Sequence, residues 1–124
     1  MAVSLNTTLR NNRADAITTF AGSGALLKIY TSGGSTLLVT LTCSATLAPA
    51  ASGGVLTLNA ITTGTAVDTG TAATASLYKS DGTTLVMSGL TVGTSASNIN
   101  LSSTTISTGD NVAVSTASIT EGNA

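Results

Sequence analysis

Residues 24–44, "GALLKIYTSGGSTLLVTLTCS", decide the fold class of this chain, because apolar side chains recur at every second position on both sides of a glycine pair. All the odd-numbered residues of the runs 25–29 and 37–43 are apolar. Alternation with a period of two is typical of a half-buried β-strand. Gly33 and Gly34 lie between the two runs, which favours a hairpin. We therefore expect two antiparallel strands with an aliphatic inner face and a threonine-rich outer face.

Similar short runs follow, separated by turns that contain glycine and aspartate. They predict further strands at 54–61, 71–79, 83–88, 98–101 and 111–120. About seven short strands at this spacing favour a mainly β fold, an antiparallel β-sandwich or a jelly roll. The Thr-x-Thr motifs do not recur at a fixed interval, which argues against a solenoid of repeats.

Residues 75–89, "ASLYKSDGTTLVMSG", predict one of the hairpins in more detail. A two-residue loop would pair Tyr78 with Leu85. A three-residue loop with Gly82 in the left-handed conformation would instead place Leu77 opposite Leu85. We prefer the second register, because it gathers the apolar side chains on one face.

A single short helix is expected before the strands, over residues 5–20. Ser4 or Asn6 can cap its start, and Gly22 can close its end. Its expected buried face consists of Leu5, Leu9, Ala16, Ile17 and Phe20, which recur near helical spacing. Threonine and asparagine are frequent in this segment and have low helix propensity, so packing has to hold the helix.

The chain thus divides into an N-terminal helical arm, residues 1–22, and a β-sandwich domain, residues 23–124. Two interpretations of the arm remain open. It packs on its own domain with its charges in water, or it reaches a neighbouring subunit that stabilises it. In the second case the candidate subunit or capsid contacts are Leu5, Leu9, Arg10, Arg13 and Phe20. Deleting residues 1–20 would then leave a soluble β domain. If the helix instead belongs to the core of its own domain, the same deletion would leave an unfolded product.

The chain is unusually poor in charge. Charged residues are 7 % of its 124 residues and the net charge is −1, against about 25 % charged residues in an average soluble domain. A net charge close to zero favours association. Hydroxyl groups cost less to bury than unpaired charges. We therefore expect much of the surface to be covered by other subunits.

Several functional classes are disfavoured by what the sequence lacks. Its four Lys and Arg residues are too few and too scattered for a nucleic-acid-binding stripe. It contains no apolar run long enough for a transmembrane helix and no apolar segment typical of a signal peptide. We therefore expect neither a nucleic-acid nor a membrane partner. The single Cys43 cannot form an internal disulfide.

Catalytic chemistry is not expected either. Without histidine, a Ser-His-Asp triad and the usual zinc sites are impossible. Cys43 lies on the apolar side of its strand and is expected to be buried. Asp68, Asp81 and Asp110 lie in turns near glycine, where aspartate is favoured for backbone reasons. They form no dense calcium-binding loop. We expect a protein that is not an enzyme, with no cofactor and no metal.

Four segments resemble a known group of proteins: "SLNTTLRNNRADAI" at 4–17, "LKIYTSGG" at 27–34, "LAPAASGGVLTLNAI" at 47–61 and "ITEGNA" at 119–124. They are similar to small virion structural proteins of tailed bacteriophages, of the head decoration or capsid cement type. The resemblance implies a β-sandwich or jelly roll that binds the outside of the capsid in many copies. Its partners would be the major capsid protein and other copies of itself, as a dimer or trimer. Its location would be the virion, assembled in the cytoplasm of the bacterial host.

Two other functions remain open at this point. A tail, neck or fibre protein of the virion differs from a decoration protein in copy number, which is in the hundreds only for decoration. A carbohydrate-binding or adhesin module would normally use aromatic platforms. Against it, the aromatic side chains are only Phe20, Tyr30 and Tyr78.

Overall fold

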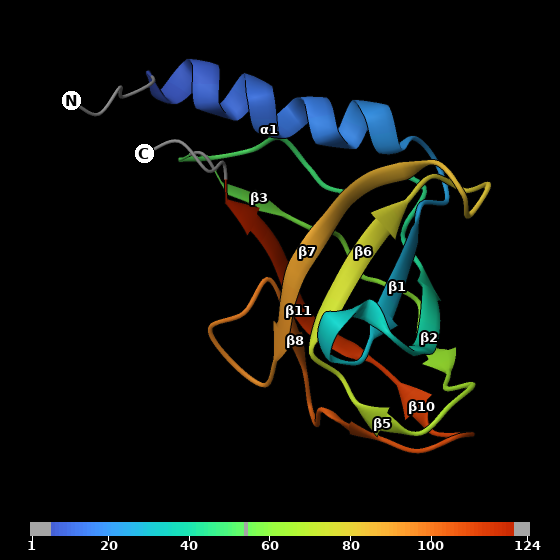
Figure 1. Ribbon diagram of the computed structural model, residues 1–124. Coiled ribbons are helices and arrows are strands. Elements are labelled where there is room, and N and C mark those ends of the chain that lie inside the picture. Colours follow the sequence, from blue (N-terminus) through green and yellow to red (C-terminus); the bar gives the residue numbers. More distant parts are fainter. Residues whose placement is uncertain (1–5, 54, 121–124) are drawn as a thin grey trace.

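A computed structural model describes residues 6–53 and 55–120, and it is mainly β with one N-terminal helix (Figure 1). This confirms the expected fold class. In chain order, the elements are α1 (Thr7–Ala21), β1 (Leu26–Tyr30), the short 3-10 turn η1 (Ser32–Gly34), β2 (Leu37–Thr42), β3 (Val55–Thr57), β4 (Gly64–Thr65), β5 (Gly70–Thr71), β6 (Thr74–Tyr78), β7 (Leu85–Gly93), β8 (Ile99–Leu101), β9 (Thr105–Ile106), β10 (Asn111–Val112) and β11 (Val114–Thr120).

Seven strands form one large sheet in the order β2-β1-β6-β7-β8-β11-β3. Two ribbons, β10–β4 and β5–β9, lie at the end of the molecule opposite α1 (Figure 1). The large sheet curls around the core in a sandwich-like arrangement. The short strands β4, β5 and β9 were not expected from the sequence.

The predicted hairpin is the centre of the core. In β1 and β2, Leu27 lies opposite Leu41 and Ile29 opposite Val39. All four side chains are fully buried. The alternation is therefore confirmed for Leu27, Ile29, Val39 and Leu41. It fails at the start of β2, where the register shifts, Leu38 is fully buried and Leu37 is only partly buried.

The outer edge of β2 is covered by a later part of the same chain. The Thr62 N–H donates to the Thr42 carbonyl at 2.9 Å, and the Val67 N–H donates to the Leu38 carbonyl at 2.8 Å. Between these bonds, a Cβ at Gly64 would lie 2.9 Å from the Thr40 carbonyl oxygen. Only glycine fits so close to the strand. An uncovered edge would be open to pairing with other chains, and this strip occupies it.

The register of the β6–β7 hairpin differs from the preferred prediction. Tyr78 pairs with Leu85, and a bulge then brings Met87 opposite Leu77. The prediction that Leu77 lies opposite Leu85 is therefore wrong. The apolar side chains are brought into line by a bulge within the strands rather than by the length of the loop.

The turn of this hairpin is held by Asp81. Its Oδ1 atom accepts the N–H groups of Thr83 at 2.9 Å and of Thr84 at 2.8 Å, and its Oδ2 atom accepts the Thr84 hydroxyl at 2.6 Å. These bonds favour the carboxylate, the Thr84 side chain most of all, and lower the pKa of Asp81 to about 2. Gly82 has a φ of +73°, the left-handed conformation that was expected.

The helix starts two residues later and ends one residue later than the predicted range 5–20, and its caps are the expected Gly22 and, of the two candidates, Asn6. The Asn6 Oδ1 atom accepts the N–H groups of Thr8 at 2.8 Å and Leu9 at 3.3 Å, so Asn6 is the N-cap. At the other end, the Gly22 N–H donates to the Thr18 carbonyl at 3.2 Å. These caps satisfy backbone groups that a helix leaves without partners at its ends.

The buried face of α1 is not the expected one. Ala14 and Ala21 lie in the core, whereas Leu9 is 47 % exposed and Phe20 is 49 % exposed. Ala16 is exposed as well, Ile17 is partly buried, and Leu5 lies outside the described residues. The small alanines let the helix lie close to β3 and β7, which it contacts. The small size of the side chains, rather than their hydrophobicity, therefore determines which face of α1 lies against the sheet.

One pair of neighbouring strands in the large sheet, β7 and β8, is parallel, whereas its other described pairs are antiparallel. Strands β7 and β8 are joined by residues 94–98 alone, although parallel neighbours normally need a crossover of about a dozen residues. Asn98 holds this tight connection. Its Oδ1 atom accepts the N–H of Thr91 at 3.0 Å and the Thr91 hydroxyl at 3.1 Å, and that hydroxyl accepts the Asn98 N–H at 2.9 Å.

Replacing Asn98→Ala should lower the free energy of unfolding by about 1–3 kcal/mol, because Thr91 loses its side-chain partner at the tight connection. Urea unfolding followed by circular dichroism measures this change. The control is Asn111→Ala, at an exposed position of β10, which should stay within about 0.5 kcal/mol of the wild type. Equal effects of the two changes would contradict the role given to Asn98.

Candidate interaction surface

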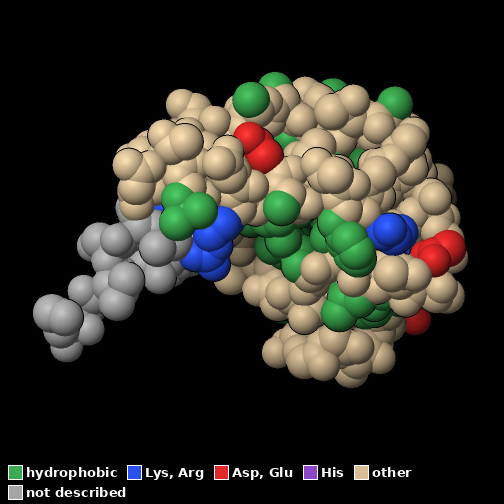
Figure 2. Space-filling view, turned by 90° about the horizontal axis from the view of Figure 1, so that it is seen from above, with side chains coloured by type: hydrophobic (Ala, Val, Ile, Leu, Met, Phe, Trp, Pro, Cys, Tyr) green, Lys and Arg blue, Asp and Glu red, His purple; other side chains and the backbone are tan. Residues whose placement is uncertain are grey.

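An exposed line of side chains runs along the outward side of α1. Leu9, Arg13, Ala16 and Phe20 are all exposed and follow one another at steps of four, three and four residues. Helical geometry puts positions with these steps on one face, and the line extends over about 16 Å at 1.5 Å per residue. We call these four residues the outer stripe. Figure 2, which looks down on α1, shows hydrophobic side chains gathered there with Lys and Arg side chains beside them.

The C-terminal end of the outer stripe is held in place by the β6–β7 turn. The Lys79 Nζ atom lies 4.3 Å from the centre of the Phe20 ring. A cation over an aromatic face contributes about 0.5–1 kcal/mol at an exposed site. Phe20 is therefore exposed but positioned, with one cation at its face.

A shallow hollow flanks the outer stripe. Its volume is about 510 Å³, and it is lined by Asn12, Asp15, Ala16, Thr19, Phe20 and Lys79. Asp15 is engaged at its floor, because its Oδ1 atom accepts the Ala51 N–H at 2.7 Å. That bond ties the middle of the helix to the segment before β3. The hollow and the outer stripe together form one surface, in which the apolar side chains of Leu9, Ala16 and Phe20 lie among Arg13, Asp15 and Lys79.

The structure brings together three of the five contact residues expected from the sequence. Leu9, Arg13 and Phe20 share the outer stripe. Arg10 lies on the other side of the helix and is partly buried. Leu5 lies outside the described residues. The hollow beside the stripe was not foreseen, because it depends on Lys79, which is far from the helix in sequence.

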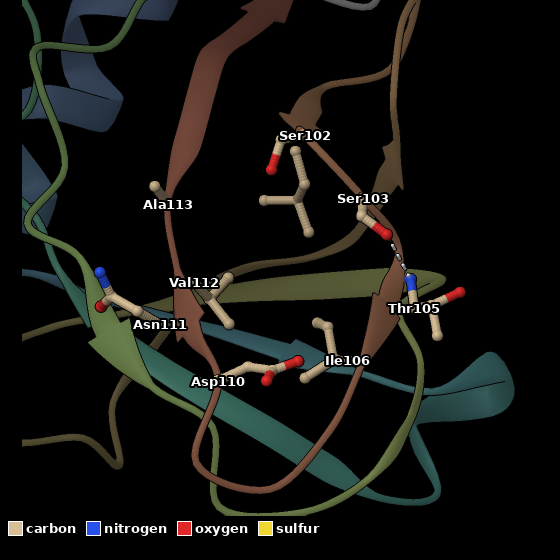
Figure 3. Close-up of a pocket in the computed structure, with 9 residues that line it drawn as sticks. Ser102, Ser103, Thr105, Ile106, Asp110, Asn111, Val112 and Ala113 are labelled. Atoms are coloured by element: carbon tan, nitrogen blue, oxygen red, sulfur yellow. Dashed lines mark hydrogen bonds between the residues drawn. The ribbon is translucent and has the colours of Figure 1, made fainter.

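A second depression lies at the opposite end of the molecule, between β9 and β10. It has a volume of about 250 Å³. Figure 3 shows Asp110 and Ile106 approaching each other from the two sides, with Val112 beside them. The Asp110 Oδ2 atom accepts the Ser107 N–H at 2.9 Å, so this carboxylate caps a turn. A single engaged carboxylate does not provide the pair of groups that acid–base catalysis uses.

Asp68, which also lies in a turn, bonds to the backbone of the next residue, because its Oδ1 atom accepts the Thr69 N–H at 2.8 Å. Within residues 6–53 and 55–120, no three side chains of Cys, His, Asp or Glu come close enough to hold a metal ion. The described chain also contains no helix with the length and hydrophobicity to span a membrane.

Cys43 is buried at the end of β2, as the sequence predicts, and is 4 % exposed. Burial raises the pKa of its thiol to about 11, because the ionised form loses its hydration. The reactive form of cysteine is the thiolate. At neutral pH this side chain therefore acts as a small apolar group of the core.

Comparisons with known proteins do not assign this fold or these surfaces to a group. No protein-family model matches the chain, and neither do any curated protein sequences or solved structures.

The thiol provides a direct test of the core around β2. Cys43 should react with a disulfide reagent at about pH 8 much more slowly in the native protein than in the unfolded one. The raised pKa alone lowers the thiolate fraction by about 100-fold, a factor of ten for each pKa unit. Absorbance of the released thiol measures the two rates, with guanidinium chloride as the denaturant. Similar rates in the native and the unfolded protein would show that the reagent reaches Cys43 at the end of β2 without unfolding.

Proposed function

We propose that this protein is a non-enzymatic structural protein of a phage virion, which binds the outer capsid shell in many copies and stabilises it. The observation that carries the proposal is the outer stripe, in which two large apolar side chains, Leu9 and Phe20, are exposed on one face of a helix in a chain with very few charges. The likeness of four segments to head decoration proteins supports the same function and suggests the capsid as the location.

The outer stripe is suited to being covered by a partner. Leu9 and Phe20 are large apolar side chains that α1 does not bury. Burying such a side chain fully contributes about 1.5–3 kcal/mol. The polar neighbours Asn12 and Thr19 are uncharged, so covering them carries little desolvation cost if they find hydrogen-bond partners.

The two cations at this surface indicate what the partner should offer. Arg13 and Lys79 stand beside the apolar side chains of the outer stripe and its hollow. A fitting partner presents an apolar groove for Leu9 and Phe20 and polar groups on its rim that tolerate these cations. On a capsid lattice, many copies of such a modest contact are held at high effective concentration. No single contact then has to be strong.

The helix is also part of the protein's own core, which changes how the proposal is tested. Ala14 is 1 % exposed. Removing residues 1–20 would therefore expose core residues, and a loss of binding would have no clear meaning. Substitutions on the outward face separate docking from folding.

The double variant Leu9→Ser/Phe20→Ser should reduce the occupancy of the protein on purified shells by at least about tenfold, which corresponds to 1.4 kcal/mol. Shells assembled from the major capsid protein of the same genome are incubated with each variant, and bound protein is measured by gel densitometry. The control is Val67→Ser, which alters an apolar side chain that is 65 % exposed away from α1. Urea unfolding should show that each variant keeps a free energy of unfolding within about 0.5 kcal/mol of the wild type, as is usual for surface substitutions.

Copy number decides between the head and the rest of the virion. Hundreds of copies per particle agree with decoration of the shell, whereas a handful would place the protein in the tail, neck or fibre. Quantitative mass spectrometry of purified virions gives this number. Absence from particles, or equal binding by the control and the double variant, would contradict the proposed function.

A further inference from the structure

The outer face of the large sheet carries a groove that is separate from the outer stripe. It has a volume of about 400 Å³ and lies beside η1, over β1, β6 and β7. Tyr30 and Tyr78 line it together with the hydroxyl side chains of Thr74, Ser76 and Ser88. In Figure 1, η1 lies in front of β6, whereas α1 lies above the ends of the strands.

The two tyrosines reach this groove through the pairing of β1 with β6. Tyr30 lies opposite Thr74, and Tyr78 lies opposite Leu26. Side chains at every second position share a face of a sheet, so both rings stand on the outer face with Ser76 between them in register. Both tyrosines are partly buried.

The ring of Tyr78 is fixed by Lys28. The Lys28 Nζ atom lies 4.7 Å from the centre of that ring and donates to the Gly82 carbonyl at 2.9 Å. The cation is thus engaged with the turn and the ring. The groove itself is lined by Tyr, Thr, Ser and Gly residues, and none of its lining side chains carries a charge at neutral pH.

The hydroxyl group of Tyr30 stays neutral over a wide range of pH. Burial is the main cause that raises the pKa of Tyr30 to about 12, and hydrogen bonding with Tyr78 adds to it. A neutral phenol can both donate and accept a hydrogen bond, as serine and threonine hydroxyls do. The groove therefore combines aromatic surfaces with several uncharged donors and acceptors.

Glycines keep the rim of the groove open. Gly33 and Gly89 have φ angles of +74° each, and a Cβ at either position would meet nothing within 4 Å. The space at these positions is open to a ligand. The backbone conformation also disfavours replacement by larger residues.

We propose that this groove binds an uncharged hexose unit of an oligosaccharide or polysaccharide. A pyranose ring presents a face of C–H groups, which packs on an aromatic ring, and a rim of hydroxyls, which bond to neutral donors and acceptors. The groove offers both kinds of contact, because two tyrosine rings and three hydroxyl side chains line it. Hydrolysis of a glycosidic bond needs two carboxyl groups, and none lines the groove. The sugar is therefore held and not cleaved.

This site goes beyond the proposed structural function and does not depend on it. A copy attached through the outer stripe would leave the groove uncovered by that contact, because α1 and η1 lie on different sides of the molecule (Figure 1). Failure of sugar binding would leave shell binding untouched, and the reverse also holds.

The chain contains its own reporter for the test. Its two tyrosines both line the groove and it has no tryptophan, so tyrosine fluorescence reports on this site. The purified full chain is titrated with maltotriose, triacetylchitotriose, mannotriose and lactose. Saturation-transfer NMR on the same samples shows which sugar protons contact the protein. At least one probe should give a saturable change with a Kd of about 0.1–1 mM, which corresponds to roughly 4–5.5 kcal/mol.

Variants then locate the binding. Ser76→Ala and Ser88→Ala should each weaken the best probe by about three- to tenfold, because a hydrogen bond to the sugar is lost. Tyr78→Ala should abolish binding by NMR. The control Phe20→Ala removes an aromatic ring outside the groove and should leave the Kd unchanged. The Ser88→Ala result stands even if the tyrosine variant does not fold, since Ser88 is exposed. No saturable response to any of the four probes would overturn the proposal, and so would binding that the serine variants do not weaken.

Discussion

The packing of aliphatic side chains across β2, β1 and β6 is the interaction on which the rest of the structure depends. Leu27 lies at its centre, opposite Leu41 on one side and Leu77 on the other, and all three are fully buried. Among the described residues the buried side chains are aliphatic or Cys43, without a ring or a charge. Such side chains fill a narrow space, so the sheet has to curl tightly and α1 has to approach through alanine.

Polar side chains in this protein mainly organise its own backbone. At the tight connection, the Asn98 side chain accepts one backbone N–H and one hydroxyl, both of Thr91. At the hairpin turn, Asp81 accepts the backbone N–H groups of Thr83 and Thr84 and the Thr84 hydroxyl. Asn100 adds a similar role, because its Nδ2 atom donates to the Ser97 carbonyl at 3.2 Å and to the Thr116 hydroxyl at 2.9 Å. Bonds of this kind fix the conformation of turns and short connections. They give a rigid scaffold, which is the property that binding surfaces need.

Local patterns in the sequence predicted those parts of the fold that follow from local rules. Alternation located β1 and β2, and the caps Asn6 and Gly22 located the helix. The inward face of α1 was missed because hydrophobicity favours Leu9 and Phe20, whereas close packing on a sheet favours Ala14 and its neighbours. The bulge in β6–β7 and the two-residue strands have no period to detect. Of the candidate surfaces, the line from Leu9 to Phe20 was visible in the helical spacing. The tyrosine groove was not, because Tyr30 and Tyr78 come together only through the pairing of strands distant in sequence.

The covered edge of β2 has a consequence for how copies of this chain meet one another. Cross-β polymers grow when an open strand edge of one chain templates the next. Here the strip from Thr62 to Val67 occupies that edge from within the chain. A single glycine, Gly64, allows the strip to lie so close to β2. Because glycine has only a hydrogen atom as its side chain, the strip can stay on the edge of β2, where it closes a route to fibrils.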